Sequence, residues 1–416
     1  MWPRSKPVGR TMKICDVTQF YSPYGGGVRR YIAEKQAFVR ARGEDEHVLV
    51  IPGARDECIM EGPCKVHTVR SPRLDRTSRY RLLLRVGRVR EILRQERPDM
   101  IELGDPYHVA WAAWMESCAL KVPVVGFYHS HFPDAYLRTV KKYCGAMAHD
   151  FVQDYARAYI ERLYGRLRRT LVPSPHLRDL LASWGVANAV VVRLGVDTGV
   201  FRPGDQDLGM RRELGVPEGR VCLLFVGRLA HEKGVATLLG AFRRLHAGAP
   251  GRFHLVVVGQ GPLRRDVEAA ARATGAVSWR GNFEDSSELA RVYRAVDIFV
   301  HPGVLETFGL VTVEAQACGL PVVGIRGSYM DRLAFCGIER WARENTPAAL
   351  AEAVRAMADG LSGGVGRAVA AAAAEYAWPK VFSELFAVYR QVCDEVADER
   401  RGEGRSGGAA LGFAGL

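Results

Sequence analysis

Residues 221–262 read VCLLFVGRLAHEKGVATLLGAFRRLHAGAPGRFHLVVVGQGP, and this stretch decides the fold. Two short apolar runs, 221–226 and 254–258, flank a helical pattern over 235–247. An apolar run, a helix and a second apolar run are typical of a βαβ unit, in which two parallel strands are buried side by side. The stretch therefore predicts a parallel sheet covered by helices.

The same alternation extends over most of the 416 residues. Apolar strands are expected at 12–17, 47–51, 100–103 and 122–127 in the first half, and at 277–279, 298–301 and 322–325 in the second. We predict two doubly wound α/β domains that face a cleft. They cover residues 1–196 and 197–377, a helix over 378–396 completes the first domain, and 400–416 is a disordered tail. Ligands in such folds bind beyond the carboxyl ends of the strands.

Composition narrows the class of protein. Hydrophobic residues make up 48% and charged residues 25% of the chain, which excludes a disordered or collagen-like protein. The net charge of +12 lies entirely within the first 196 residues, which predicts an anionic partner. A nucleic-acid-binding protein is one alternative, but no helix-turn-helix, zinc finger or RNA-binding platform is evident. We therefore expect no nucleic acid partner.

The sequence shows no apolar run long enough to span a bilayer and no secretory signal. The nine cysteines include no C-x-x-C pair, which favours reduced thiols. We expect a cytoplasmic protein that can also contact the cytoplasmic face of the membrane. The expected contact is made by residues 70–97, where ten arginines are interspersed with leucines and valines. With a helix over 80–96, this segment resembles a membrane-surface helix; the alternative is a solvated helix that covers its own sheet.

Two cations follow the strand 221–226. Arg228 and Lys233 precede the helix at 235, and a helix N-terminus with two fixed cations suits a diphosphate. The alternative is an ordinary solvated loop. Gly259 and Gly261 follow the next strand, where a G-x-G turn lets a ligand approach the backbone. A plain tight turn explains these two glycines equally well.

Residues 301–315, HPGVLETFGLVTVEA, contain two carboxylates. Glu306 lies in a loop and Glu314 in the helix that follows. Because Glu306 lies on the loop, both carboxylates can face one ligand. Carboxylates accept hydrogen bonds from sugar hydroxyls, and the free amides near Phe308 and Gly309 can hold phosphate. The alternative is a capping acid and a surface acid.

The first half offers matching candidates. Gly26 and Gly27 follow the first strand and open a helix, so their amides can contact a phosphate, although a flexible turn is as good an explanation. His129 and His131 follow the strand 122–127. Ligands bind at this place in such folds, so one of the two histidines can donate a hydrogen bond to a ligand. Their spacing, without a third ligand, argues against a metal site. The alternative is a histidine with a purely structural role.

Together, FVGRLAHEKG and HPGVLETFGLVTVEAQACGLPVVG resemble the retaining GT-B glycosyltransferases of family 4. The resemblance covers about residues 12–396. It implies that Glu306 contacts the donor sugar, Glu314 the ribose, and Arg228 with Lys233 the diphosphate. It also implies that Phe308 and Gly309 contact the sugar through their backbone.

On the other domain, the resemblance places Gly26 and Gly27 at the β-phosphate. His129, rather than His131, matches the active-site histidine near the reacting sugar. Catalysis would then involve His129, Glu306, Arg228 and Lys233, without a protein nucleophile.

No D-x-D motif lies in a catalytic context, so neither a metal nor another cofactor is expected. The resemblance is to GDP-mannose-dependent α-mannosyltransferases and to sulfoquinovosyl-type enzymes that use UDP-sugars. It predicts transfer of a hexose, with mannose from GDP-mannose favoured, to a lipid-linked or glycan acceptor. The chain departs from the family pattern after Gly324, where the usual glycine-rich loop is replaced by residues 325–332.

Overall fold

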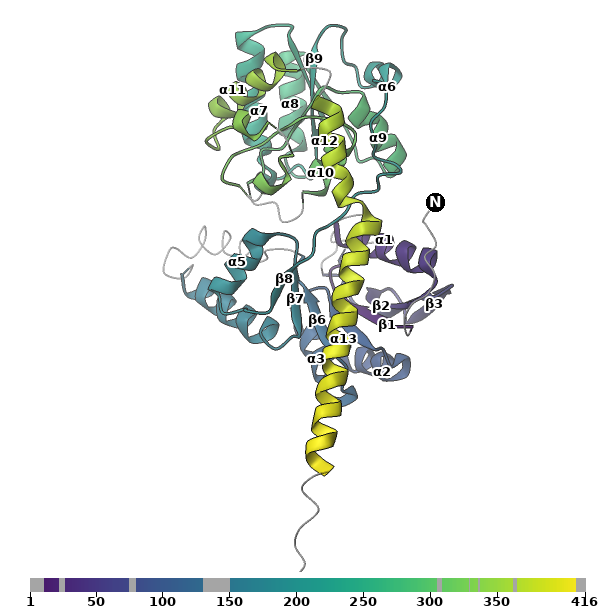
Figure 1. Cartoon of the computed structure of the whole chain (residues 1–416). Helices are drawn as coiled ribbons and strands as arrows, with labels where there is room; N and C mark the ends of the chain where they lie inside the picture. Colours follow the sequence, from purple (N-terminus) through teal and green to yellow (C-terminus); the bar gives the residue numbers. More distant parts are fainter. Residues whose placement is uncertain are drawn as a thin grey trace, which may run out of the picture. The chain divides into compact units, whose positions relative to one another are not determined.

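The structure is a computed structural model that describes residues 11–21, 27–74, 80–129, 150–304, 309–328, 330–335, 337–361 and 365–408. The chain divides into two compact units (Figure 1). Unit 1 comprises Met1–Arg193 and Val381–Leu416, and unit 2 comprises Leu194–Lys380. Unit 2 is therefore an insertion between the two segments of unit 1. For comparison, the sequence placed the first boundary at 196/197 and began the returning helix at 378.

Unit 1 contains an eight-stranded sheet in the order β3-β4-β2-β1-β5-β6-β7-β8. All neighbouring strands pair in parallel except β3 and β4, which form an antiparallel hairpin. The strands are β1 (Lys13–Val17), β2 (Glu46–Gly53), β3 (Glu57–Glu61), β4 (Cys64–Arg70), β5 (Met100–Leu103), β6 (Val124–Phe127), β7 (Arg169–Val172) and β8 (Ala189–Val191).

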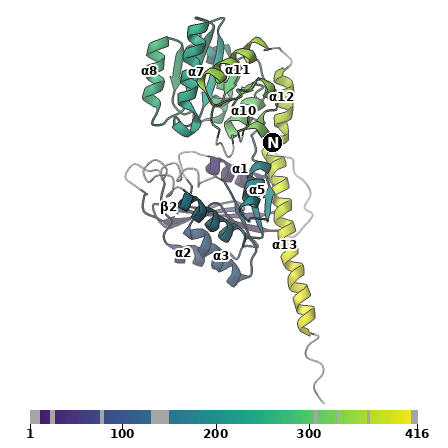
Figure 2. The same cartoon turned by 90° about the vertical axis from the view of Figure 1, so that its left-hand side faces the viewer.

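Helices cover both faces of this sheet. One face carries α2 (Val86–Glu96), α3 (His108–Leu120), a helix over residues 150–164, and α5 (Pro175–Ser183), which share one apolar core. The opposite face carries α1 (Gly27–Arg42) and α13 (Trp378–Gly408), which meet through aromatic contacts of Phe38 with Phe382 and Phe386. Figure 2 shows α1 on the side of the sheet opposite to α2 and α3. Because side chains alternate along a strand, β1 sends Cys15 and Val17 into the first core and Asp16 toward α1.

Unit 2 contains a parallel five-stranded sheet in the order β11-β10-β9-β12-β13. Its two apolar cores lie on opposite faces, one under α7, α8 and α11, the other under α6, α9, α10 and α12. The strands are β9 (Val221–Val226), β10 (Phe253–Val258), β11 (Val277–Arg280), β12 (Ile298–Val300) and β13 (Val322–Val323). The helices are α6 (Leu208–Glu213), α7 (Val235–Gly248), α8 (Arg264–Thr274), α9 (Ser286–Arg294), α10 (Leu310–Ala317), α11 (Pro347–Asp359) and α12 (Val365–Ala373). The predicted doubly wound α/β architecture is thus confirmed in both units.

Two predicted elements differ from the structure. The helix expected over 80–96 begins only at Val86. Before α2 starts, backbone hydrogen bonds run instead from Leu74 N to Tyr80 O and from Leu82 N to Pro72 O. The disordered tail expected from residue 400 is wrong for 400–408, because α13 continues to Gly408. Asp398 and Arg401 form an i,i+3 ion pair on this extension, and residues 409–416 lie outside the described part of the chain.

Candidate active site

In unit 2, three loops meet at the carboxyl edge of the sheet because β10, β9 and β12 are adjacent strands. After β9, residues 227–230 lead into the short helix η1 (His231–Lys233) and then into α7. Gly234 joins η1 to α7 with a φ of +69°. A Cβ at this position would lie 2.8 Å from Pro302 O, so the cation-bearing loop and the loop after β12 pack backbone to backbone.

The two predicted diphosphate cations both lie in the β9 loop. Arg228 is exposed, and its Nη1 is 3.8 Å from Glu232 Oε1. Lys233 is half-buried and directly precedes Gly234, the residue that caps the N-terminus of α7. Since unpaired N–H groups and the positive end of the helix dipole lie at that terminus, Lys233 adds a full charge where an anion is already favoured.

The predicted G-x-G turn packs against the β9 loop. Gly259 has a φ of +142°, and a Cβ there would lie 1.9 Å from Gly227 O. A Cβ on Gly261 would lie 2.4 Å from Leu229 O. Leu229 N also donates to Gln260 O at 2.9 Å. Both glycines therefore allow a close approach, and the partner in this structure is the backbone of the neighbouring loop. Their contact with a ligand stays a prediction.

The loop after β12 leads into α10, where Gly309 occupies the N-cap position with a φ of +62°. Met330 and Leu333 pack so closely on Gly309 that a Cβ there would lie within 3 Å of both side chains. Glu314 is buried in the middle of α10 and accepts a hydrogen bond from Tyr293 Oη at 3.1 Å. Glu314 is therefore no surface acid, which removes half of the alternative interpretation of this segment.

Segment 330–335 overlaps the end of residues 325–332, where the chain departs from the family pattern. Gln316 of α10 holds it in place: its Nε2 donates to Leu333 O at 2.6 Å, and its Oε1 accepts from Phe335 N at 3.1 Å. Two side chains of this segment, Met330 and Leu333, pack on Gly309 and so cover the start of α10.

In unit 1, His129 follows β6 and is almost fully buried. Its ring stacks on the ring of Phe127, with the ring centroids 4.2 Å apart and an interplanar angle of 3°. The ring of Tyr31 meets the imidazole edge-on, with the centroids 5.1 Å apart. Burial lowers the pKa of His129 to about 3, so the imidazole is neutral over the physiological pH range. A neutral ring can donate a hydrogen bond from one nitrogen and accept one on the other.

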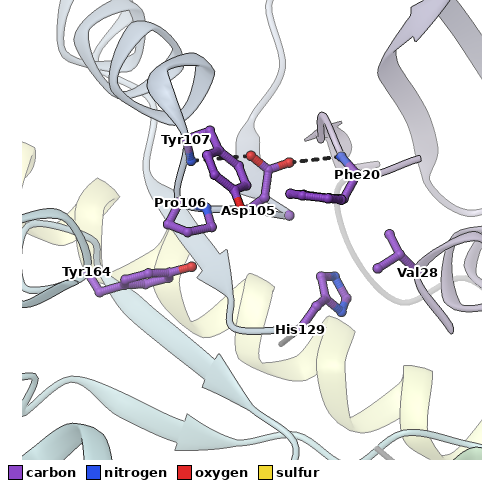
Figure 3. Close-up of a pocket in the computed structure, with 8 residues that line it drawn as sticks. Phe20, Val28, Asp105, Pro106, Tyr107, His129 and Tyr164 are labelled. Carbon is purple, nitrogen blue, oxygen red and sulfur yellow. Dashed lines mark hydrogen bonds between the residues drawn. The ribbon is translucent and has the colours of Figure 1, made fainter. Parts of the chain in front are cut away.

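His129 lines a pocket that sequence reasoning did not assemble (Figure 3). The residues around it come from the loops after β1, β5 and β6, from the start of α1 and from the helix over 150–164. They are Phe20, Val28, Gly104, Asp105, Pro106, Tyr107, His129 and Tyr164. Gly27, one of the two predicted phosphate-binding glycines, begins α1 and directly precedes Val28, which lines this pocket.

Asp105 is the charged residue of that pocket. Its carboxylate accepts hydrogen bonds from Thr18 Oγ1 at 3.0 Å, from Phe20 N at 3.3 Å, from Tyr107 N at 3.4 Å and from Gln19 N. Burial raises the pKa of Asp105, and these hydrogen bonds oppose the rise. The carboxylate thus ties the loop after β1 to the loop after β5. The available sequence signal was an acid between Gly104 and Pro106, directly after a strand.

Four candidates, Gly26, His131, Glu306 and Phe308, lie outside the described residues. Within the described ranges, no group of three or more His, Cys, Asp or Glu side chains has the arrangement of a metal site. Nor does any helix in those ranges have the length and hydropathy needed to cross a membrane.

Comparisons with known proteins agree with this architecture. The family described as Glycosyltransferase Family 4 matches residues 25–200, and the family described as Glycosyl transferases group 1 matches residues 220–359. Among solved structures, sucrose-phosphate synthase from Thermosynechococcus elongatus superposes with a TM-score of 0.73 at 18% identity, covering 92% of this chain and 99% of that one. At that identity the likeness concerns the fold alone.

Curated relatives are closer in sequence. A GDP-mannose-dependent alpha-mannosyltransferase of Corynebacterium glutamicum is 30% identical over 331 residues, covering 76% of this chain and 73% of the relative. A GDP-mannose-dependent alpha-(1-6)-phosphatidylinositol dimannoside mannosyltransferase of Mycobacterium tuberculosis is 29% identical over 355 residues, covering 83% and 87%. A sulfoquinovosyl transferase of Arabidopsis thaliana is 31% identical over 236 residues, covering 55% and 43%. Two family models match the chain, and the Corynebacterium relative is 30% identical over about three quarters of both proteins. The chain therefore belongs to glycosyltransferase family 4 and is a glycosyltransferase of the GT-B fold.

Proposed function

We propose that the enzyme transfers mannose from GDP-mannose to a lipid-linked or glycan acceptor, with retention of the anomeric configuration. The observation that carries this proposal is the relationship to two mannosyltransferases, each described as GDP-mannose-dependent, over three quarters or more of the chain. The second of these acts on a phosphatidylinositol dimannoside, which supports a lipid-linked acceptor.

In this proposal the leaving diphosphate is stabilised by Arg228, Lys233 and the N-terminus of α7. Positive charge at that point acts where negative charge develops in the transition state. Glu314 holds the ribose, with its carboxylate oriented by Tyr293. Glu306 and the backbone at Phe308 and Gly309 hold the donor sugar.

On the unit 1 side, Gly26 and Gly27 contact the β-phosphate and neutral His129 contacts the reacting sugar. The acceptor attacks from the face that the diphosphate leaves, so the departing phosphate takes the acceptor proton and no protein nucleophile is needed. Fixed cations and a helix dipole replace a metal ion as the counter-charge, so we propose that turnover is metal-independent. Activity that survives exhaustive chelation supports this step, and activity restored only by a divalent cation contradicts it.

A UDP-sugar donor is the second candidate. The relationship to a sulfoquinovosyl transferase favours it, although that match covers less of both chains. A thermal-shift screen against GDP, UDP and ADP separates the two, because a ligand that binds only the folded state stabilises it by about 2.7 kcal/mol at a hundred times its Kd. GDP as the best stabiliser supports the mannosyl donor, whereas UDP as the best stabiliser replaces it. Transfer of radiolabelled sugar to a membrane lipid extract then tests the reaction itself.

A peripheral contact with the cytoplasmic membrane face is part of the proposal for a lipid-linked acceptor. The structure changes its basis. Arg90 and Arg94 of α2 both pair with Glu116 of α3, at 2.8 and 2.6 Å, so these two arginines are partly neutralised. The exposed apolar side chains of this region are instead Leu74, Tyr80 and Leu84, which precede α2. Aspartate substitution of Leu84 should weaken binding to vesicles containing anionic lipid, and unchanged binding argues against this contact.

A further inference from the structure

Unit 1 contains a cluster of charged and polar side chains in the layer between the sheet and the helices α1 and α13. Its members are Asp16 of β1, Lys35 of α1, His47 of β2, Glu102 of β5 and Tyr389 of α13, and none is more than 3% exposed. Buried charges cost free energy unless they are paired and hydrogen-bonded. Each charged member of this cluster therefore depends on the partners that the other members provide.

Lys35 lies at the centre of the cluster. Its Nζ contacts Asp16 Oδ1 at 2.8 Å, Glu102 Oε2 at 3.1 Å and Tyr389 Oη at 2.8 Å. The Tyr389 hydroxyl accepts from Lys35 and donates to Glu102 Oε2, so one hydroxyl of α13 links the ammonium to the carboxylate. Because Tyr389 is the contribution of α13, the position of Glu102 depends on a residue far along the chain.

Glu102 connects the cluster to the pocket. Its Oε1 accepts a hydrogen bond from Tyr31 Oη at 3.2 Å. The ring of Tyr31 meets both His129 and Phe127 edge-on, at 5.1 and 5.0 Å, and Phe127 stacks on His129. Tyr31 also contacts Phe382 of α13 at 5.7 Å. The imidazole therefore rests on a ring whose far end is fixed by Glu102.

Two observations separate this arrangement from ordinary core packing. Apolar packing of Tyr31 would not need its hydroxyl, whereas the hydroxyl here is bonded to the carboxyl group of Glu102, which Tyr389 of α13 also contacts. The charges of Asp16 and Lys35 also act on the pKa of His129, the first raising it and the second lowering it. The cluster is therefore close enough to influence the imidazole both sterically and electrostatically.

We propose that Tyr389 of α13 is a positioning residue for His129 and acts on it through Glu102 and Tyr31. This inference rests on the proposed place of His129 beside the reacting sugar. It assigns to the returning helix a function in the transfer step besides completing unit 1. A small displacement of a group that contacts the transition state lowers kcat, while donor binding by the residues of unit 2 is unaffected.

The test compares Tyr389→Phe and Tyr31→Phe, each of which removes a hydroxyl and keeps the ring. Each variant should lower kcat about tenfold with the donor KM unchanged, after activity is normalised to the folded fraction. The double variant should be no slower than the slower single variant, because both hydroxyls act through Glu102. Tyr155→Phe is the matched control, since Tyr155 is exposed, and it should keep wild-type kcat.

Three results would overturn the inference: kcat unchanged in Tyr389→Phe, a donor KM that rises in place of the fall in kcat, or losses that multiply in the double variant. His129→Ala distinguishes this failure from failure of the proposed function. If His129→Ala lowers kcat and Tyr389→Phe does not, only the positioning role is wrong. If His129→Ala leaves kcat unchanged, the proposed role of the histidine is itself wrong. Should Tyr389→Phe fold poorly, Tyr31→Phe supplies the same readout with the contacts of Lys35 intact.

Discussion

Asp16 and Glu102 are paired in register on the adjacent parallel strands β1 and β5, and one ammonium group, Lys35 Nζ, contacts both carboxylates. The ammonium is closer to Asp16, which also lies 3.0 Å from His47 Nε2. These neighbours lower the pKa of Asp16 against the effect of burial, whereas burial and the charge of Asp16 raise the pKa of Glu102. Asp16 therefore carries the negative charge, and Glu102 is the carboxylate that takes up a proton more readily.

Replacing Lys35 with methionine leaves that charge without its partner. We expect Lys35→Met to reduce the free energy of unfolding of unit 1 by about 3–5 kcal/mol, as removal of one partner from a buried ion pair does. Urea denaturation followed by tryptophan fluorescence measures the change. Arg55→Met is the control, because the Arg55–Glu57 pair lies on the surface and its loss should have little effect. If Lys35→Met loses no more unfolding free energy than the control, the cluster does not stabilise unit 1.

The shifted pKa of Glu102 predicts a pH dependence of stability. Because its pKa in the folded protein is raised to about 7, above the unfolded value near 4.5, the folded state binds more protons between these values. Stability contributed by Glu102 is thus present below about pH 4.5 and is lost as the pH rises through 7. Between pH 5 and pH 8, the wild type should lose more unfolding free energy than Glu102→Gln does. Parallel pH profiles for the two proteins would contradict the shift.

The packing of the G-x-G turn predicts a large difference between two glycines. Gly259→Ala should destabilise unit 2 by about 1–3 kcal/mol through its φ of +142° alone, with a further cost from the clash with Gly227 O. Gly87→Ala is the matched control: Gly87 lies in α2, a Cβ there meets no atom within 4 Å, and alanine favours the helix. Calorimetric melting temperatures should fall for the first variant and stay level or rise for the second.

The diphosphate assignment predicts a loss of ligand-linked stabilisation. Arg228→Ala and Lys233→Ala should each reduce the thermal stabilisation by the best nucleoside diphosphate, because each removes a cation beside the start of α7. Arg243→Ala removes an exposed arginine further along the same helix and should leave the stabilisation unchanged. If the ligand raises the melting temperature equally in all three variants, the diphosphate does not bind at Arg228 and Lys233.

The contact between Tyr293 and Glu314 predicts an effect on the donor KM. Tyr293→Phe removes the hydroxyl that donates to Glu314 and should raise the donor KM severalfold with a small effect on kcat, because the proposed ribose contact of Glu314 would be the same in the ground and transition states. Steady-state kinetics at saturating acceptor measures both constants. A fall in kcat with the donor KM unchanged would instead assign Glu314 to the chemical step.

The sequence predicted the strands of unit 2 to within a few residues, because 221–226 and 255–258 are apolar throughout and β9 and β10 are buried on both faces. It missed the hairpin of β3 and β4. All five residues of β3 are exposed, so Glu57–Glu61 shows no burial pattern that alternation could reveal. It also missed α3, which is apolar on several sides because it lies against both the sheet and α2.

The candidate site was predictable where it follows strand ends and not where it depends on side chains that meet from distant segments. Arg228 and Lys233 were found from their place after β9. The pairing of Lys35 with Tyr389 joins residues 354 positions apart, and no local pattern announces it. One signal was available: Asp16 and Glu102 are the only acids within two short, mainly apolar strands, and buried acids need a partner.

The insertion of unit 2 into unit 1 has a consequence for biosynthesis. A ribosome delivers residues 1–193 first, but Lys35 and Glu102 in that segment lack their hydroxyl partner until Tyr389 emerges. Unit 2 is one continuous stretch, Leu194–Lys380. Unit 1 therefore receives its last segment only after all of unit 2 has been synthesised.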